Sequence, residues 1–244
     1  MNFYQKIMDR YSVREFDTNN PITDDEYKKI IDAVNSAPTS SNWHSSSVIV
    51  VKDREILTEL SKANKFTGAL KTADILLVFL ADFNRMNEAK KEFPEYEYNS
   101  NSTESYTVAV GDAFIQATMA QDMALSLGLD TLFLGLTRMM VEPLITNLNI
   151  QGQAFPVVSL AIGHKASEGK IKPKLNRVFE NKYDIDRLKH DVAEYNDQIL
   201  DYFKLIAPDK AAYSYTHATI KSASSYKMNT DIIEKIWDLK LIKK

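Results

Sequence analysis

The sequence predicts an α+β fold for this 244-residue chain. Three observations carry the prediction. A helical pattern precedes the first strand pattern, the strand patterns are short and continuously apolar, and helices surround the strands without the regular alternation of a doubly wound sheet. With 44% hydrophobic and 26% charged residues, a chain of this length can bury one sizeable core. We therefore expect a single domain over residues 1–244.

Helix signals come early in the chain. Residues 1–10 are expected to form a short helix, and residues 23–36 a second one. Thr23 and Glu26 have the Thr-x-x-Glu spacing of a capping box, in which each side chain satisfies a backbone N–H at the start of a helix. The second helix is expected to end before Pro38, because proline disfavours the helical conformation of the residue preceding it.

Four apolar runs are predicted as strands. They are Ser47–Val51, Ile75–Leu80, Thr131–Leu136 and Ala154–Ile162, the last closed by Gly163. Runs that are apolar throughout, rather than at every second residue, are typical of strands that sit inside the protein. The polar stretch 86–105 is expected to form an excursion beside the core, and helices are expected again from Asp184 onward.

The longest predicted helix covers residues 106–127 and is apolar on most sides. Small residues such as Ala109 and Ala113 would let another helix approach closely, and Gly128 provides a C-terminal stop. Such a helix has to be covered, either by its own chain or by a second copy. Its polar residues are interpreted as patches at a helix interface and not as a general acid–base set: Asp112, Gln116, Gln121 and Asp122.

Composition and missing motifs exclude several function classes. A net charge of -3 gives no electrostatic basis for binding nucleic acid or a membrane surface. Zero cysteine excludes thiolate chemistry, and the four histidines lack zinc-site spacing, so no metal is expected. Neither a dinucleotide-binding G-x-G-x-x-G nor a G-x-S-x-G nucleophile elbow occurs. With neither a membrane span nor a signal-peptide core, the protein is expected to be cytoplasmic.

Polar side chains that suit a polar or phosphorylated ligand occur in three segments. Arg10 and Arg14 flank Ser12 at the end of the first predicted helix, and guanidinium forks suit phosphate and carbonyl oxygens. Residues 38–47 form a loop rich in Ser, Thr and Asn, and Lys172 and Lys174 stand on either side of a proline. Taken one at a time, a solvated helix end, a plain loop and surface lysines are the simpler explanations.

Taken together and in order, these segments resemble the FMN-dependent nitroreductase superfamily over almost the whole chain. The matching segments are RYSVREF at 10–16, APTSSNWH at 37–44, ADFNR at 81–85, LFLGLTR at 132–138, FPVVSLAIG at 155–163, and KPKL with FENKY at 172–183. The chain is most similar to the branch of the major oxygen-insensitive nitroreductase and the NADPH-flavin oxidoreductases. This resemblance implies a central, mostly antiparallel sheet flanked by helices. It also implies a homodimer in which the helical extension 184–244 wraps the partner subunit.

The resemblance also assigns contacts to the cofactor FMN. Arg10 and Ser12 would contact its phosphate or ribityl chain, and Arg14 would lie by the N1–C2 carbonyl edge of the flavin. Tyr11, between them, is a further cofactor-binding residue. Ser40, Asn42 and His44 would line the flavin, and in this family part of their loop usually comes from the other subunit. The remaining contacts are Leu134, Gly135 and Leu136 on the reactive N5 side, Lys172 and Lys174 on the phosphate, and a second-tier contact near Asn64 or Lys65.

By this resemblance the protein is an NAD(P)H-dependent nitroreductase or FMN reductase. It would pass a hydride from NADPH or NADH through flavin N5 to nitroaromatics, quinones or free flavin by a ping-pong mechanism. Because the cofactor carries the chemistry, no catalytic side chain is expected, although Arg14 would stabilise the reduced flavin. Three alternatives stay open: a reductase that hands reduced flavin to a partner enzyme, an FMN-holding redox sensor without fast turnover, and an α+β interaction domain.

Three positions depart from the pattern of the family. Tyr11 stands where Arg or His is frequent, and His44 stands where Gln is frequent. Members that prefer NADPH tend to carry an arginine-rich stretch in the C-terminal third, whereas residues 209–214 offer Lys210 as their only cation. Lys210 is therefore the candidate nicotinamide contact, and use of NADH instead of NADPH is left open.

Overall fold

The computed structural model describes residues 2–209, 213–225 and 231–238. The chain divides into two units, one made of residues 1–168 and 229–244 and the other of residues 169–228. The first unit holds the sheet and the second holds two helices. No helix in these described ranges is both long and apolar enough to cross a membrane.

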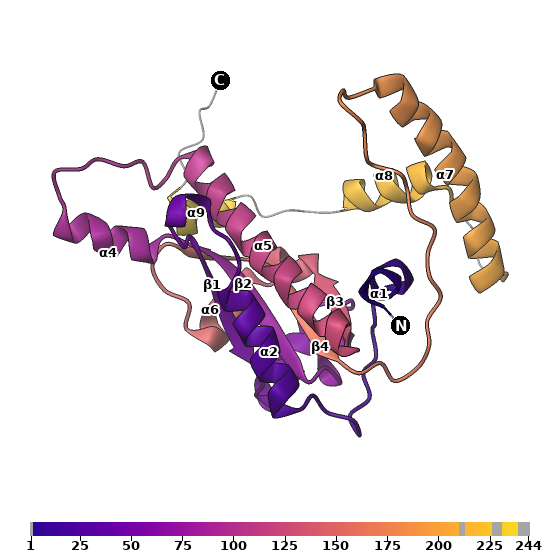
Figure 1. The fold of residues 1–244 in the computed structure, drawn as a ribbon, viewed down its shortest axis with the longest axis horizontal. Helices are drawn as coiled ribbons and strands as arrows, with labels where there is room; N and C mark the ends of the chain where they lie inside the picture. The colour runs from indigo at the N-terminus through magenta and orange to yellow at the C-terminus, as the bar shows by residue number, and fades with distance from the viewer. Residues whose placement is uncertain (1, 210–212, 226–230, 239–244) are drawn as a thin grey trace. The chain divides into compact units, whose positions relative to one another are not determined.

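Within the described part of the first unit, four antiparallel strands form one sheet in the order β1-β2-β4-β3 (Figure 1). The register aligns Asp82 with Ala154 at one end of the sheet, the Asp82 end, and Ile75 with Ile162 at the other, the Ile75 end. The predicted α+β fold with an antiparallel sheet is confirmed. The strands are β1 Ser46–Val51, β2 Ile75–Asp82, β3 Asp130–Leu134 and β4 Ala154–Gly163.

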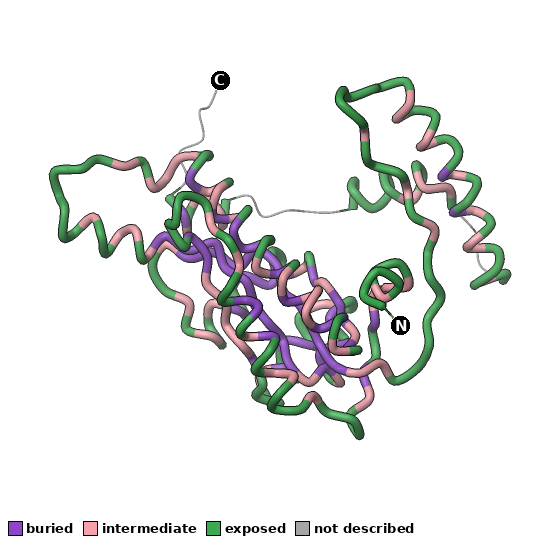
Figure 2. The backbone as a smooth tube through the Cα atoms, in the orientation of Figure 1, coloured by how far each residue is buried: buried purple, intermediate pink, exposed green. Residues whose placement is uncertain are grey.

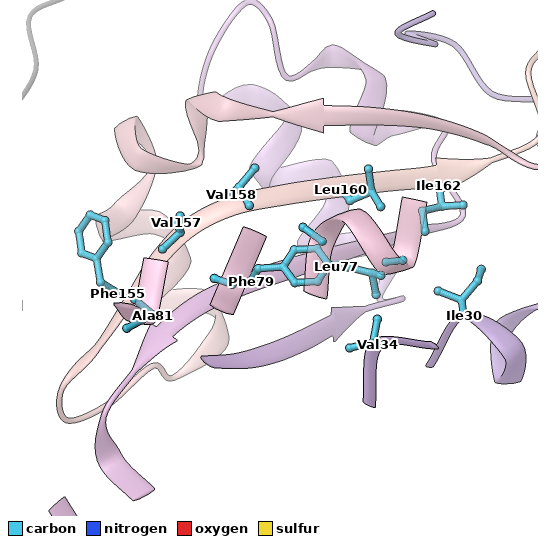
Figure 3. Packing of buried hydrophobic residues seen from close by; sticks show 14 of the residues in the cluster. Ile30, Val34, Leu77, Phe79, Ala81, Phe155, Val157, Val158, Leu160 and Ile162 are labelled. Carbon is cyan, nitrogen blue, oxygen red and sulfur yellow. The ribbon is translucent and has the colours of Figure 1, made fainter. Parts of the chain in front are cut away.

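Helices cover both faces of this sheet. Alternate residues of β2 enter different clusters, with Leu77 and Phe79 on one face and Leu76 and Val78 on the other. The first face packs against α2 (Asp24–Asn35) and α5 (Thr103–Leu127), and the second against α3 (Arg54–Lys62) and α6 (Val141–Leu148). Figure 3 shows Leu77 and Phe79 close to side chains of β4 and α2. Burial on both faces explains why β2 and β4, the two central strands, are almost entirely apolar.

The helix α5 lies along the first face, in front of the sheet in Figure 1. Its alanines at positions 109, 113, 117, 120 and 124 are fully buried, and they share one side of the helix through their i, i+4 and i, i+3 spacing. Figure 2 shows burial concentrated in the sheet and on this side of α5. On its other side, Phe114 and Ile115 are 42% and 39% exposed. Gly128 ends the helix with a φ of 90°, as predicted.

Two predicted boundaries needed correction. The helix α5 begins at Thr103 rather than Tyr106, because Ser102 caps it by accepting the Ser105 N–H at 3.0 Å. The predicted strand Thr131–Leu136 ends at Leu134, and residues 135–139 form a 3₁₀ turn. The buried Thr137 hydroxyl lies 2.6 Å from the Leu134 carbonyl oxygen, which turns the chain out of the sheet.

The sequence predicts helices at the start of the chain and from Asp184 onward, and the structure has helices there, whereas α3 and α6 are not predicted. Helix α1 spans Phe3–Asp9, α2 begins with the predicted capping box of Thr23 and Glu26, and α4 (Asn84–Glu92) lies in the polar excursion. In the first unit, α9 (Asp231–Trp237) packs against β4 and buries Trp237 completely. In the second unit, α7 (Ile185–Ile206) and α8 (Tyr215–Ser225) meet through the Tyr195 and Tyr215 rings, whose centroids are 5.2 Å apart.

The turn that leads into β4 requires glycine at position 152. Gly152 has a φ of 68°, and a Cβ there would overlap the Asn84 side chain. The Asn84 amide accepts the Gln153 N–H and donates to the Gln151 carbonyl oxygen, both at 3.0 Å. We expect Gly152→Ala to lower the free energy of unfolding by roughly 2–3 kcal/mol, from left-handed strain plus weakened hydrogen bonds.

Urea unfolding followed by circular dichroism measures this loss. Gly68→Ala is the matched control, because nothing lies within 4 Å of a Cβ at that position. If both variants unfold at the same urea concentration, Gly152 does not hold this turn.

Candidate functional site

The first predicted binding segment, residues 10–16, lies at the Ile75 end of the sheet. Helix α1 ends at Asp9, and from Arg10 the chain runs extended beside β3 and β4. The Val13 N–H donates to the Thr131 carbonyl oxygen at 3.2 Å, and the Asp17 N–H donates to the His164 carbonyl oxygen at 2.7 Å. Thr131 lies at the start of β3, and His164 directly follows the end of β4. The segment is therefore fixed to the sheet through its backbone.

The side chains of this segment divide between local contacts and the surface. Arg14 is exposed, and its Nη1 donates to the Ser12 carbonyl oxygen at 3.1 Å. Tyr11 is half-buried, and its hydroxyl donates to the Ser167 carbonyl oxygen at 3.2 Å. Arg10 is also half-buried. The structure thus brings the predicted phosphate and carbonyl contacts of this segment onto one edge of the first unit.

The second predicted segment is a loop with a strained backbone. Ser41, Asn42 and His44 have φ values of 49°, 59° and 49°, in the left-handed region. This conformation costs a non-glycine residue roughly 1–2 kcal/mol, and such residues cluster at functional sites. The side chains of Ser40, Asn42 and His44 are exposed, and Asn42 Oδ1 lies 3.1 Å from His44 Nε2. The three predicted flavin contacts therefore share one exposed, strained loop.

A buried carboxylate lies beneath this loop. Asp112 of α5 is only 3% exposed, and it accepts hydrogen bonds from the Thr39 hydroxyl at 2.5 Å and the Ser45 hydroxyl at 2.6 Å. The sequence predicts Asp112 as part of a polar patch at a helix interface and does not reveal this role. Its position among the buried alanines of α5 was the available signal, because a buried carboxylate needs hydrogen-bond donors. Further along α5, burial raises the pKa of Asp122.

Arg85 braces the same loop where it enters β1. Its Nη1 donates to the Ser46 carbonyl oxygen at 3.2 Å and to the Ser47 hydroxyl at 3.0 Å, and the Ser47 hydroxyl donates to Asp82 at 2.5 Å. Between Arg85 and the loop lies a polar cavity of about 140 Å³, bordered also by His44. This cavity is smaller than the roughly 300–1,000 Å³ of typical ligand pockets. The ADFNR segment thus holds the end of the loop through Arg85, a role that the family resemblance does not assign to it.

Within one chain the two binding segments lie at opposite ends of the sheet. The loop leads into Ser46, which pairs with Ala81 at the Asp82 end. At about 3.3 Å per residue, β2 separates its two ends by roughly 20–25 Å. The helix α5 gives a similar separation, because Asp112 holds the loop while the Ser126 carbonyl oxygen accepts Lys6 of α1 at 2.9 Å. One chain therefore does not bring its own Arg14 and Asn42 together.

The other predicted contacts of the first unit lie in turns. Leu134 is buried at the end of β3, Gly135 is exposed, and Leu136 is half-buried in the turn that follows. Asn64 and Lys65 follow α3, where Asn64 Oδ1 accepts the Phe66 N–H at 3.1 Å. The Lys65 ammonium lies 4.9 Å from the centroid of the neighbouring Phe66 ring. Asn64 is thus engaged inside its own turn.

The second unit carries the predicted lysines. Lys172 and Lys174 are exposed, and the Lys172 ammonium lies 5.5 Å from the centre of the Phe203 ring. Lys172 also borders a cavity of about 620 Å³ between α7 and α8, together with Tyr195. The Tyr195 hydroxyl donates to the Pro173 carbonyl oxygen at 2.9 Å, which fixes the lysine segment to α7. Lys210 lies outside the described residues.

Among the residues that the structure describes, no three His, Cys, Asp or Glu side chains gather in an arrangement that could hold a metal ion.

Comparison with known proteins identifies the family. The nitroreductase family model matches residues 7–164, more than half of the chain. An FMN reductase (NAD(P)H) of Bacillus subtilis is 32% identical over 203 residues, covering 81% of each chain. An NADPH-dependent oxidoreductase of Staphylococcus aureus is 30% identical over 208 residues, covering 82% of each chain. The solved structure of NfrA2 from B. megaterium has a TM-score of 0.91 at 25% identity, over the full length of both chains. The chain belongs to the nitroreductase family.

Proposed function

We propose that this protein is an NAD(P)H-dependent flavin oxidoreductase with FMN as its cofactor. The observation that carries the proposal is its membership of the nitroreductase family, with relatives named FMN reductase and NADPH-dependent oxidoreductase over about four-fifths of the chain. When bound, FMN supplies a hydride carrier. It would accept a hydride from NAD(P)H in one half of a ping-pong cycle and pass it to a nitroaromatic, a quinone or free flavin in the other half.

The exposed groups of the candidate site fit a flavin. Arg14 presents a planar guanidinium that suits a carbonyl edge and stabilises negative charge developing there. Asn42 and His44 provide donors and acceptors for a heterocyclic edge, and Gly135 leaves room for a flat ring beside the backbone. Arg10, Lys172 and Lys174 are the cations proposed to hold the phosphate, with Tyr11, Ser12, Ser40 and the Asn64–Lys65 turn as further contacts.

The same proposal includes a homodimer. A second copy that placed its 39–45 loop beside Arg14 of the first would complete a site whose parts stand roughly 20–25 Å apart in one chain. The outer side of α5 supports this arrangement, because Phe114 and Ile115 leave apolar surface exposed there. The proposed wrapping of the partner by residues 184–244 would add to the same interface.

Flavin binding and turnover test the function. Purified protein is expected to bind FMN, to be yellow, and to oxidise NADH or NADPH when a quinone, a nitrofuran or free FMN is supplied. Bound FMN without turnover on any acceptor would favour the redox sensor instead. Protein that stays colourless after addition of FMN would overturn the proposal. The remaining alternative would then be the α+β interaction domain without a flavin. Comparing NADH with NADPH decides the nicotinamide preference that the sequence leaves open.

A charge on the outer side of α5 is expected to split the dimer. Wild-type protein should have about twice the 27.8 kDa chain mass in light scattering, and Ile115→Lys should have the mass of one chain. A lysine buried in an apolar interface would lose its hydration without gaining a partner. Thr58→Lys, an exposed position on α3, is the matched control and should remain dimeric. Wild-type protein with the mass of one chain would refute the dimer.

A further inference from the structure

Asp112 contacts both ends of the strained loop through one carboxylate group. Its Oδ1 accepts the Ser40 N–H at 3.0 Å. Its Oδ2 accepts the Thr39 hydroxyl at 2.5 Å, the Ser45 hydroxyl at 2.6 Å and the Ser45 N–H at 3.3 Å. The loop therefore leaves the carboxylate at Thr39 and Ser40 and returns to it at Ser45. Because Asp112 is buried, these donors stand in for its lost hydration.

We propose that Asp112 is a positioning residue for cofactor binding, and that its carboxylate closes the 39–45 loop into the shape that presents Ser40, Asn42 and His44 to a flavin. The flavin as ligand rests on the proposed function. The closure of the loop by Asp112 does not depend on it.

The left-handed backbone gives this anchor its importance. Ser41, Asn42 and His44 hold conformations that side chains disfavour, so contacts from outside have to maintain them. The Thr39 hydroxyl donates to Asp112 and accepts the His44 N–H at 3.0 Å. Through the Thr39 hydroxyl, Asp112 is thus linked to the backbone of His44 near the end of the loop. Arg85 adds a second contact there, from its Nη1 to the His44 carbonyl oxygen at 3.3 Å.

The geometry requires a carboxylate and not its amide. Each oxygen of Asp112 accepts a backbone N–H, from Ser40 on one side and Ser45 on the other. A hydroxyl can rotate to accept a hydrogen bond, but a backbone N–H only donates. In Asp112→Asn the amide NH₂ must therefore face one of the two N–H groups, and one end of the loop is released.

Hydrogen exchange of the cofactor-free protein tests this role directly. Asp112→Asn is expected to speed exchange in residues 39–45 by roughly tenfold, the loss expected for one hydrogen bond to a charged acceptor, with exchange in β1 and β2 unchanged. The affinity for FMN, measured by titration of the same protein, is expected to fall by roughly tenfold. Asp122→Asn makes the same chemical change further along α5, outside the loop network, and should alter neither quantity.

Each outcome decides the role of Asp112. Unchanged exchange in a folded Asp112→Asn protein would overturn it, and so would an equal rise in Asp122→Asn or a rise spread over the whole sheet. If wild-type protein binds no FMN, the proposed function fails while the exchange experiment still tests the anchor. If Asp112→Asn does not fold, two other variants weaken the same network and should each speed exchange in the loop alone. Ser45→Ala removes the Ser45 hydroxyl contact to Asp112, and Thr39→Val removes the hydroxyl that links Asp112 to the His44 N–H. Unchanged loop exchange in both would also overturn the proposal.

Discussion

Replacing Trp237 by alanine is expected to lower the free energy of unfolding by roughly 3–5 kcal/mol, as truncation of a buried tryptophan does. Trp237 is fully buried, and its ring centroid lies 5.2 Å from that of Phe83 and 5.3 Å from that of Tyr106. Burial in the same cluster raises the pKa of Tyr106 to about 12. Loss of the indole would leave a cavity between α9, α5 and the sheet that these aromatic rings cannot fill.

A second substitution separates packing from hydrogen bonding. The Trp237 indole N–H has no hydrogen-bond partner among the residues described, so Trp237→Phe gives up volume but no such bond. Its loss of stability should be less than half that of Trp237→Ala. Urea unfolding at one protein concentration measures both, with circular dichroism as the signal because Trp237 is one of two tryptophans. An alanine variant as stable as wild type would show that α9 does not close this core.

The strands could be predicted because their burial is visible in the sequence. The run Ile75–Leu80 is apolar at every position, and the structure buries every residue of β2 between two helical layers. The end of β3 could not be predicted, since Leu136 continues the apolar pattern. Where the chain leaves the sheet, the Thr137 hydroxyl contacts the Leu134 carbonyl oxygen and the Ser159 hydroxyl, and Arg138 donates to the Val157 carbonyl oxygen. Apolar pattern reports burial, and polar contacts decide where an element stops.

The sequence names candidate residues for the site but not their arrangement. Motif order predicts the 37–44 loop and the 10–16 segment as binding segments, but it does not show that they lie at opposite ends of one sheet, which depends on strand register. Asp112 was missed for a related reason. Its partners Thr39, Ser40 and Ser45 are distant in the sequence, and an acidic residue on an apolar helix does not reveal which loop will cover it.

Arg14→Ala is expected to weaken FMN binding by roughly 10- to 100-fold, which corresponds to one charge-assisted hydrogen bond of about 1.5–3 kcal/mol. Arg14 is exposed and bound at one nitrogen to the Ser12 carbonyl oxygen, so its removal should leave the fold unchanged. Arg14→Lys keeps the charge but loses the planar guanidinium group, so its FMN affinity should lie between those of the wild type and Arg14→Ala. Glu15→Ala is the matched control at the next exposed position. Equal FMN affinity in all four proteins would place the flavin away from Arg14.

Mixed dimers test whether Arg14 and the loop of the same chain serve different sites. If a site combines Arg14 of one subunit with Asn42 of the other, a heterodimer of Arg14→Ala and Asn42→Ala chains has one site with both defects and one with neither. It should therefore bind FMN at wild-type affinity in half of its sites, although both parent homodimers bind weakly. If each site used one chain only, both sites of the heterodimer would be defective. Titrating the tag-purified heterodimer with FMN distinguishes these outcomes by the fraction of sites with wild-type affinity. We expect half of the sites to have it, because Arg14 and Asn42 of one chain lie at opposite ends of the sheet.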